Sequence, residues 1–83
     1  MMMVFDDTAK RKIRFQTRRG LLELDLVLGR FMEREFEQLN DEELAAFVEI
    51  LEFQDQDLLA LVNGYTQTEK THLIPLLDRI RQA

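Results

Sequence analysis

The residues best suited to surface chemistry form one short run, 18–25, with the sequence RRGLLELD. Arg18, Arg19 and Gly20 stand where one helical segment is expected to end. Two carboxylates, Glu23 and Asp25, follow in the first turns of the next segment. Charges of both signs suit docking against a polar partner, and a glycine between them lets another surface approach closely. The run therefore predicts a polar binding patch.

A purely structural interpretation of the same residues stays open. Arg19 and Glu23 are four positions apart, so on one helix they would share a face and form an ion pair worth about 0.3–0.5 kcal/mol. Glu23 near a helix N-terminus is also favoured by the helix dipole, whatever its function. The density of charge favours binding instead. The candidate partner-binding residues are Arg14, Arg18, Arg19, Gly20, Glu23 and Asp25.

No catalytic or metal-binding set emerges from the sequence. Glu23 and Asp25, two positions apart, would project from different sides of a helix and cannot act as an acid–base pair. His72 is the only histidine, and Glu69 alone does not complete a zinc site. The acidic stretch 55–57 lacks the glycine and distant glutamate of a calcium loop. We therefore expect no enzyme, no metal and no cofactor of the protein's own.

The chain of 83 residues is long enough for one domain, 1–83. Charge is distributed unevenly along it. Residues 1–34 carry eight Lys/Arg and five Asp/Glu, whereas residues 35–83 carry three and eleven, for a formal charge of −5. A basic end suggests nucleic acid as a partner. The acidic remainder opposes that interpretation, and Phe15 is the one aromatic close to the basic run 10–14, so we expect no nucleic-acid binding.

The N-terminal residues do not form a secretory signal, because no basic stretch precedes a long apolar run. No segment approaches the ~20 apolar residues that span a bilayer. Cysteine is absent, which fits a reducing compartment. We expect a cytoplasmic protein without membrane insertion, monomeric when free, with residues 1–7 disordered.

The apolar pattern predicts an all-α fold, a compact bundle of about five helices. The second segment, 21–36, carries a stripe at the spacing of a buried helix face. That stripe consists of Leu21, Leu24, Leu28 and Phe31, widened by Leu22, Val27 and Met32. The patch beside it is expected to lack apolar bulk, so its contacts should be transient and sensitive to salt.

Capping and turn residues predict where the other helices begin and end. Asp7 or Thr8 is expected to cap a first helix ending near Thr17, and Asn40 with Glu43 to open the third. A fourth helix, 58–62, is expected to be capped by Asp55 or Asp57 and to end at residues 63–64. A fifth helix is expected to start at Thr66 or Thr68. It either bends at Pro75 or becomes regular only there. We assign Phe31, Phe36, Phe47 and Phe53 to the core; an exposed Phe15 would belong to an interface.

The run 18–25, in its place after a basic first helix, resembles the signature of the SdhE family, the FAD assembly factors of succinate dehydrogenase. The resemblance continues through Phe31, the pair Phe36 and Leu39, the acidic stretch 41–43 and the stretch 51–58, and it covers about residues 8–64. It implies a five-helix bundle. Family members often carry a tryptophan where this chain has Leu61, which we expect to be a packing position.

The resemblance also implies a function. Such proteins bind the flavoprotein subunit of succinate dehydrogenase, and of the related fumarate reductase, and promote covalent attachment of FAD to a histidine of that subunit. The family's Arg-Gly-x-x-Glu falls on Arg19, Gly20 and Glu23, which would form the contact surface, with Arg18 and Asp25 flanking it. FAD would belong to the client. Arg19 would anchor to polar client groups, and Glu23 would orient client side chains.

Two other functions stay open on the sequence. A small acidic bundle with one basic patch is also compatible with a regulatory protein-interaction module such as an antitoxin. A small nucleic-acid-binding domain is the weaker alternative, and it would be recognised by DNA binding that falls steeply with salt.

Overall fold

The structure is a computed structural model that describes residues 5–83. Five α-helices and two short 3-10 turns follow one another, and no strand occurs within the described part, which confirms the predicted all-α class. The elements are α1 (Asp7–Gln16), α2 (Leu22–Glu35), η1 (Phe36–Gln38), α3 (Asp41–Leu51), α4 (Asp55–Val62), η2 (Thr71–Leu73) and α5 (Ile74–Gln82).

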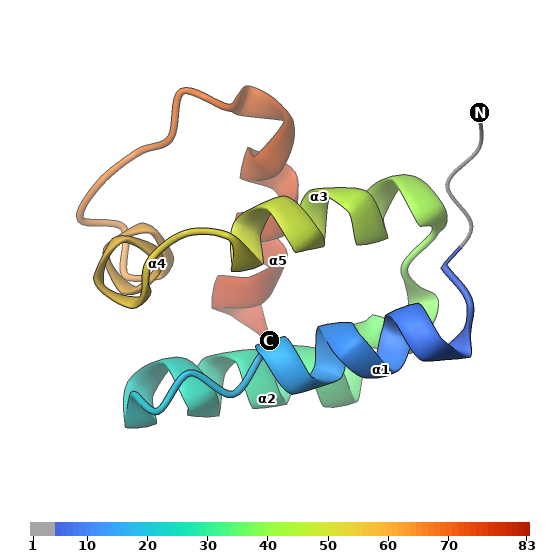
Figure 1. Ribbon diagram of the computed structural model, residues 1–83. Coiled ribbons are helices and arrows are strands. Elements are labelled where there is room, and N and C mark those ends of the chain that lie inside the picture. Colours follow the sequence, from blue (N-terminus) through green and yellow to red (C-terminus); the bar gives the residue numbers. More distant parts are fainter. Residues whose placement is uncertain (1–4) are drawn as a thin grey trace.

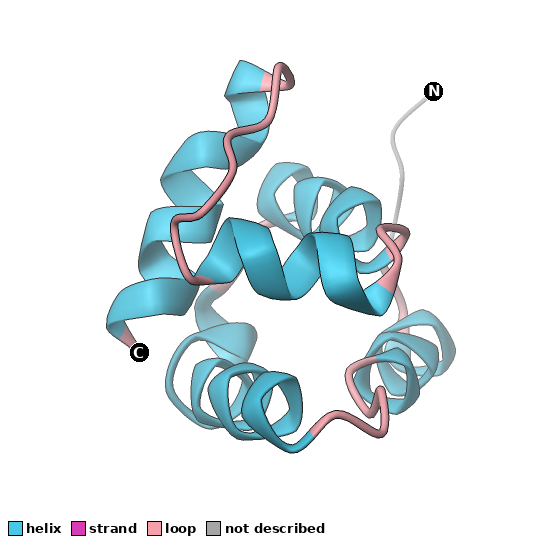
Figure 2. Cartoon of the chain, turned by 90° about the vertical axis from the view of Figure 1, so that its left-hand side faces the viewer, coloured by secondary structure: helices cyan, strands magenta, loops and turns pink. Residues whose placement is uncertain are grey.

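Three helices share one direction, and the other two cross them in different directions (Figure 1 and Figure 2). In Figure 1, α1, α2 and α3 extend along one common direction, with α2 running opposite to the other two, while α5 crosses behind them and α4 is seen end-on. Figure 2, turned by 90°, shows α4 lengthwise in front of the ends of the first three helices. α5 packs against α2, α3 and α4. The loop between α1 and α2 and the turn between α3 and α4 therefore lie at the same end of the bundle.

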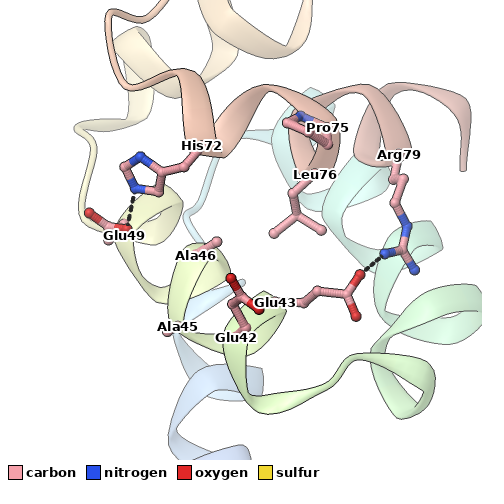
Figure 3. A pocket seen from close by; sticks show the side chains of 9 residues that line it. All are labelled: Glu42, Glu43, Ala45, Ala46, Glu49, His72, Pro75, Leu76 and Arg79. Carbon is pink, nitrogen blue, oxygen red and sulfur yellow. Dashed lines mark hydrogen bonds and ion pairs between the residues drawn. The ribbon is translucent and has the colours of Figure 1, made fainter. Parts of the chain in front are cut away.

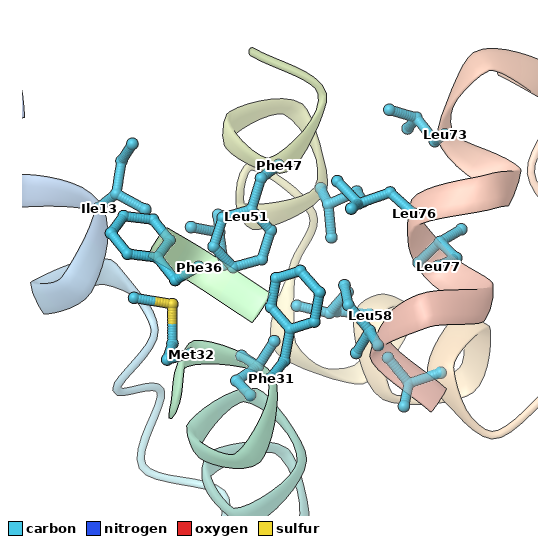
Figure 4. Close-up of a cluster of buried hydrophobic side chains, with 14 of the residues drawn as sticks. Ile13, Phe31, Met32, Phe36, Phe47, Leu51, Leu58, Leu73, Leu76 and Leu77 are labelled. Atoms are coloured by element: carbon cyan, nitrogen blue, oxygen red, sulfur yellow. The ribbon is translucent and has the colours of Figure 1, made fainter. Parts of the chain in front are cut away.

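Three phenylalanines lie at the centre of the core (Figure 4). The ring centroids of Phe31 and Phe47 are 5.1 Å apart, and those of Phe36 and Phe47 are 6.4 Å apart. All three are fully buried, as predicted, whereas Phe53 is partly buried and packs against the core's edge. Leu61 is buried on α4, which confirms its expected role in packing.

One predicted core residue is wrong. Leu24, Leu28, Phe31 and Met32 form the buried face of α2, but Leu22 is 75% exposed. Two positions along a helix correspond to roughly 200° of rotation, so Leu22 points away from the face that Leu24 presents to the core. The apolar stripe is therefore narrower than predicted.

Capping explains where two helices begin. Asn40 and Glu43 form the predicted capping box, in which each side chain accepts a hydrogen bond from the other's backbone N–H. α1 is capped by Asp6, whose Oδ1 accepts from the N–H of Ala9 at 2.8 Å, so the predicted caps, Asp7 or Thr8, were one and two residues late. Residues 1–4, most of the stretch predicted to be disordered, lie outside the described residues.

The structure also shows where α4 begins and ends and where α5 begins. α4 is a turn longer than predicted, and its N-cap is Gln54, which makes no side-chain capping bond. The two predicted caps, Asp55 and Asp57, are already inside the helix. Gly64 follows α4 with a φ of 79°, the left-handed residue expected there. α5 begins at Ile74, beside Pro75, after residues 65–70 that form no helix. The predicted start at Thr66 or Thr68 was therefore wrong, and the alternative of a regular part that begins near Pro75 is correct. In the described part of the chain, no helix has the length and apolarity needed to cross a membrane.

Candidate partner-binding surface at the α1–α2 loop

The loop between α1 and α2 is shaped by its own polar groups. At its start, the hydroxyl of Thr17 donates to the carbonyl oxygen of Arg14 at 2.7 Å. Further along, the backbone N–H of Arg19 donates to Oδ1 of Asp25 at 2.8 Å, so a carboxylate from the first turn of α2 reaches back into the loop. Gly20, which directly follows Arg19, has a φ of 83°, a conformation that residues with a side chain rarely adopt. Asp25 and Gly20 therefore set the course of the loop.

The side chain of Arg19 is turned inward rather than toward solvent. Its Nε donates to Oδ1 of Asp55 at 2.7 Å, and Nη1 donates to the carbonyl oxygen of Leu51 at 2.7 Å. Nη2 donates to the carbonyl oxygen of Phe53. With only 14% of this side chain exposed, Arg19 joins the α1–α2 loop to the turn between α3 and α4. We call these contacts of Arg19 with Leu51, Phe53 and Asp55 the Arg19 clamp.

The clamp replaces the ion pair that the sequence left open. Arg19 precedes α2, so it does not share a helical face with Glu23, and its carboxylate partner is Asp55. Sequence reasoning missed this role of Asp55, for which it rejected a calcium loop and predicted a helix cap. The pairing joins residues 36 positions apart, and no local spacing could have revealed it.

Four of the predicted residues are exposed: Arg14, Arg18, Gly20 and Glu23. The side chains of Arg18 and Glu23 make no hydrogen bond or ion pair within residues 5–83. A Cβ built on Gly20 would meet no atom within 4 Å, so the space beside this glycine is open. Arg18, Gly20 and Glu23 are free to meet a partner, whereas Arg19 and Asp25 are already engaged.

Arg14, in the last turn of α1, is bound to the 3-10 turn η1. Its guanidinium forms an ion pair with Glu37 and lies 4.7 Å from the ring centroid of Phe36. Two arginines of the basic N-terminal part are thus paired with acidic residues of the C-terminal part. This pairing reduces the free positive charge that a nucleic-acid interface would need.

A hollow between α1 and α2 brings part of the predicted set together. It has a volume of about 450 Å³, and Arg14, Arg18 and Asp25 line it together with Gly29 and Met32. A shallower hollow on the side of the clamp is lined by Arg18, Arg19 and Phe15, among others. The exposed cation of Arg18 therefore stands between two depressions of the surface.

The surface near the loop is more apolar than expected. Phe15 is 80% exposed at the end of α1, and Leu22 and Leu26 are 75% and 56% exposed on the first two turns of α2. The expectation of a patch without apolar bulk is therefore wrong. The sequence did not reveal these leucines as surface residues, because they interleave with the buried residues of α2.

A second pocket, between α3 and α5, is separate from the loop (Figure 3). His72 and Glu49 approach to 2.7 Å between Nε2 and Oε2 at one end, and Arg79 is paired with Glu43 at the other. The backbone N–H of Asn40 and then the guanidinium of Arg79 lower the pKa of Glu43. No group of three or more potential metal ligands occurs in the part of the chain that the structure describes. The pocket's polar groups serve to join α3 to the C-terminal elements.

Comparison with known proteins adds an independent observation. Residues 11–83 match the protein family described as "Flavinator of succinate dehydrogenase". The protein named FAD assembly factor SdhE from Vibrio vulnificus strain CMCP6 is 41% identical over 71 residues, which cover 86% of this chain and 83% of that protein. The protein of the same name from Legionella pneumophila strain Lens is 37% identical over 76 residues, covering 92% and 95% of the two chains.

Proposed function

Because this chain belongs to the family of succinate dehydrogenase flavinators, we propose that it binds the flavoprotein subunit of succinate dehydrogenase and promotes covalent attachment of FAD to it. The observation that carries the proposal is the match over residues 11–83, which includes the whole α1–α2 loop with its exposed charges. The sequence resemblance extends the proposal to the flavoprotein subunit of fumarate reductase as a second client.

The six candidate residues divide into two roles on this surface. Arg18 and Glu23 offer exposed, unengaged charges to the client, and the open space at Gly20 admits a client segment close to the backbone. Arg19 and Asp25 hold the loop that presents them. Arg14 lines the adjoining hollow and extends the surface along α1.

The protein acts by orientation rather than by chemistry of its own. The bond between FAD and the client's histidine forms within the client, which holds the FAD. A helper that fixes two reacting groups in the productive arrangement removes much of the entropic barrier to their reaction. Docking of the α1–α2 loop would hold the client in such an arrangement. The relatives' name, assembly factor, agrees with a protein that is not itself an enzyme.

The test uses covalent flavin as its readout, since only covalently bound FAD stays with the flavoprotein on a denaturing gel. A strain lacking this gene should lose the fluorescent flavoprotein band, and the wild-type gene should restore it. Glu23→Ala should fail to restore it. Glu33→Ala is the matched control, because Glu33 is another exposed glutamate of α2, farther from the loop.

The opposite results would be equally clear. A flavoprotein band that is unchanged by deletion of the gene would refute the assembly function. Restoration by Glu23→Ala at native expression, with the band as strong as for Glu33→Ala, would leave the function in place and remove Glu23 from the contact surface.

A further inference from the structure

We propose that Leu22 and Leu26 form an apolar ridge that packs against an apolar patch on the flavoprotein subunit. This inference rests on the proposed function and adds apolar side chains to the charged residues of the contact surface. The ridge consists of two leucine side chains, 75% and 56% exposed, on successive turns of the same helix.

The two leucines share one outward-facing line on α2. Residues four apart on a helix are neighbours, so Leu22 and Leu26 adjoin one another. Leu24 lies between them in sequence but on the opposite side, where it is completely buried. The ridge thus faces away from the core, and neither leucine belongs to the partly buried side chains that pack against it.

Folding of this chain does not explain the ridge. Single exposed leucines are common on protein surfaces. Here two of them adjoin on one helix face, next to the exposed carboxylate of Glu23 and the loop that carries Arg18. Buried apolar groups ringed by polar ones are the usual anatomy of a protein interface.

The ridge is too small to hold a second copy of this chain, or any other protein, by itself. A stable interface buries about 800 Å² on each partner and involves roughly 20–30 residues a side. Two leucine side chains supply a small part of that area, so the ridge can only anchor a larger surface. The surface continuous with it carries the charges proposed to meet the client, and this assigns the ridge to the same partner.

The ridge and the charges would contribute differently to binding. Burial of the leucines is largely independent of salt, whereas contacts of Arg18 and Glu23 weaken as salt screens them. Binding should therefore persist in part at high ionic strength. A patch made of charges alone would release its partner under those conditions.

The experiment compares two double variants of the full chain for binding to the purified flavoprotein subunit, by calorimetry at low and high salt. Leu22→Gln with Leu26→Gln removes the ridge, while glutamine keeps a high helix propensity. Tyr65→Gln with Ile74→Gln is the matched control, since these residues are 81% and 42% exposed on another part of the surface. Melting temperatures of both variants should stay close to that of the wild type.

The ridge variant should bind the subunit about tenfold or more weakly than the wild type, which corresponds to about 1.4 kcal/mol. The control should bind within about twofold of the wild type. The ridge variant should keep the wild-type salt dependence and simply be weaker at every salt concentration, because its charges are intact.

Other outcomes separate the two proposals. If the wild type binds the subunit and the ridge variant binds equally well, the ridge inference is wrong and the proposed function stands. If the wild type does not bind the subunit at all, the proposed function fails and the ridge inference fails with it. A wild-type dimer in sedimentation that the ridge variant abolishes would assign the ridge to self-association and overturn the inference.

Discussion

Arg19 and Asp55 are joined by a 2.7 Å contact between Nε and Oδ1, although 36 residues separate them in the chain. The same guanidinium donates to the backbone carbonyls of Leu51 and Phe53. One side chain therefore binds three groups around the turn between α3 and α4, and its own backbone N–H is held by Asp25. The family motif that includes Arg19 thus has a structural part as well as an exposed part.

The Arg19 clamp should contribute measurably to stability. Arg19→Ala removes hydrogen bonds from a charged donor to three acceptors, and we expect the free energy of unfolding to fall by about 2 kcal/mol. Asp55→Ala should cost less, about 0.5–1 kcal/mol, because the carboxylate is 39% exposed and Arg19 keeps its two carbonyl partners. Urea unfolding at pH 7 measures both.

The contact between the two residues can be isolated by combining these changes. In a double-mutant cycle, Arg19→Ala and Asp55→Ala should be non-additive by about 0.5–1 kcal/mol, since they share one contact. Arg19→Lys serves as the control for charge, because lysine lacks the planar fork that reaches several acceptors at once. Additive effects in unfolding would contradict the clamp.

Substitutions of Gly20 should distinguish the cost of its left-handed backbone conformation from any steric clash of an added side chain. Gly20→Ala should destabilise the protein by about 1 kcal/mol, because the φ of 83° is unfavourable for alanine while no atom lies near the added Cβ. Gly20→Asn should cost less, since asparagine tolerates left-handed angles. Thermal unfolding ranks the variants. If Gly20→Asn folds normally yet fails to support flavinylation, close approach of the client at this residue is supported.

Stability should depend on pH through Glu43. The N–H of Asn40 and the guanidinium of Arg79 lower the pKa of this carboxyl from its usual 4.5 in the folded state. Its contribution is therefore complete above pH 4.5 and is lost as the pH falls through the lower folded value. Glu43→Gln keeps an acceptor for the capping box but removes the charge.

Chemical denaturation of the wild type and Glu43→Gln across a range of pH tests whether this stability is lost at low pH. The wild type should be more stable than Glu43→Gln at pH 7, and the difference should shrink as the pH falls below 4.5. A difference that stays constant from pH 7 to pH 3 would show that the charge of Glu43 does not stabilise the fold.

Nucleic acid should not bind this protein with useful affinity. Arg14 and Arg19 are paired with Glu37 and Asp55, and the chain as a whole is acidic. Fluorescence anisotropy with a labelled duplex should give a dissociation constant above about 10⁻⁴ M at physiological salt. Tight binding that weakens steeply with added salt would instead revive the nucleic-acid alternative.

Local sequence determined the presence of the helices and several of their ends, although it misplaced the caps of α1 and α4. The capping box at Asn40 and Glu43, the stop at Gly64 and the regular start of α5 at Pro75 depend on residues within a few positions of each other. Such short-range rules hold in any context, so they could be applied without knowing the fold. The family resemblance could likewise be recognised from residues 18–25 in their place between the basic first helix and the downstream pattern.

Tertiary structure alone decided which motif residues are available to a partner. Arg18 and Arg19 are adjacent and chemically identical, yet one is exposed and the other is clamped against Leu51, Phe53 and Asp55. The exposure of Leu22 was decided in the same way, by the direction from which α3, α4 and α5 cover α2. Contacts between distant segments depend on how whole helices pack, so they cannot be predicted from the local spacing of residues.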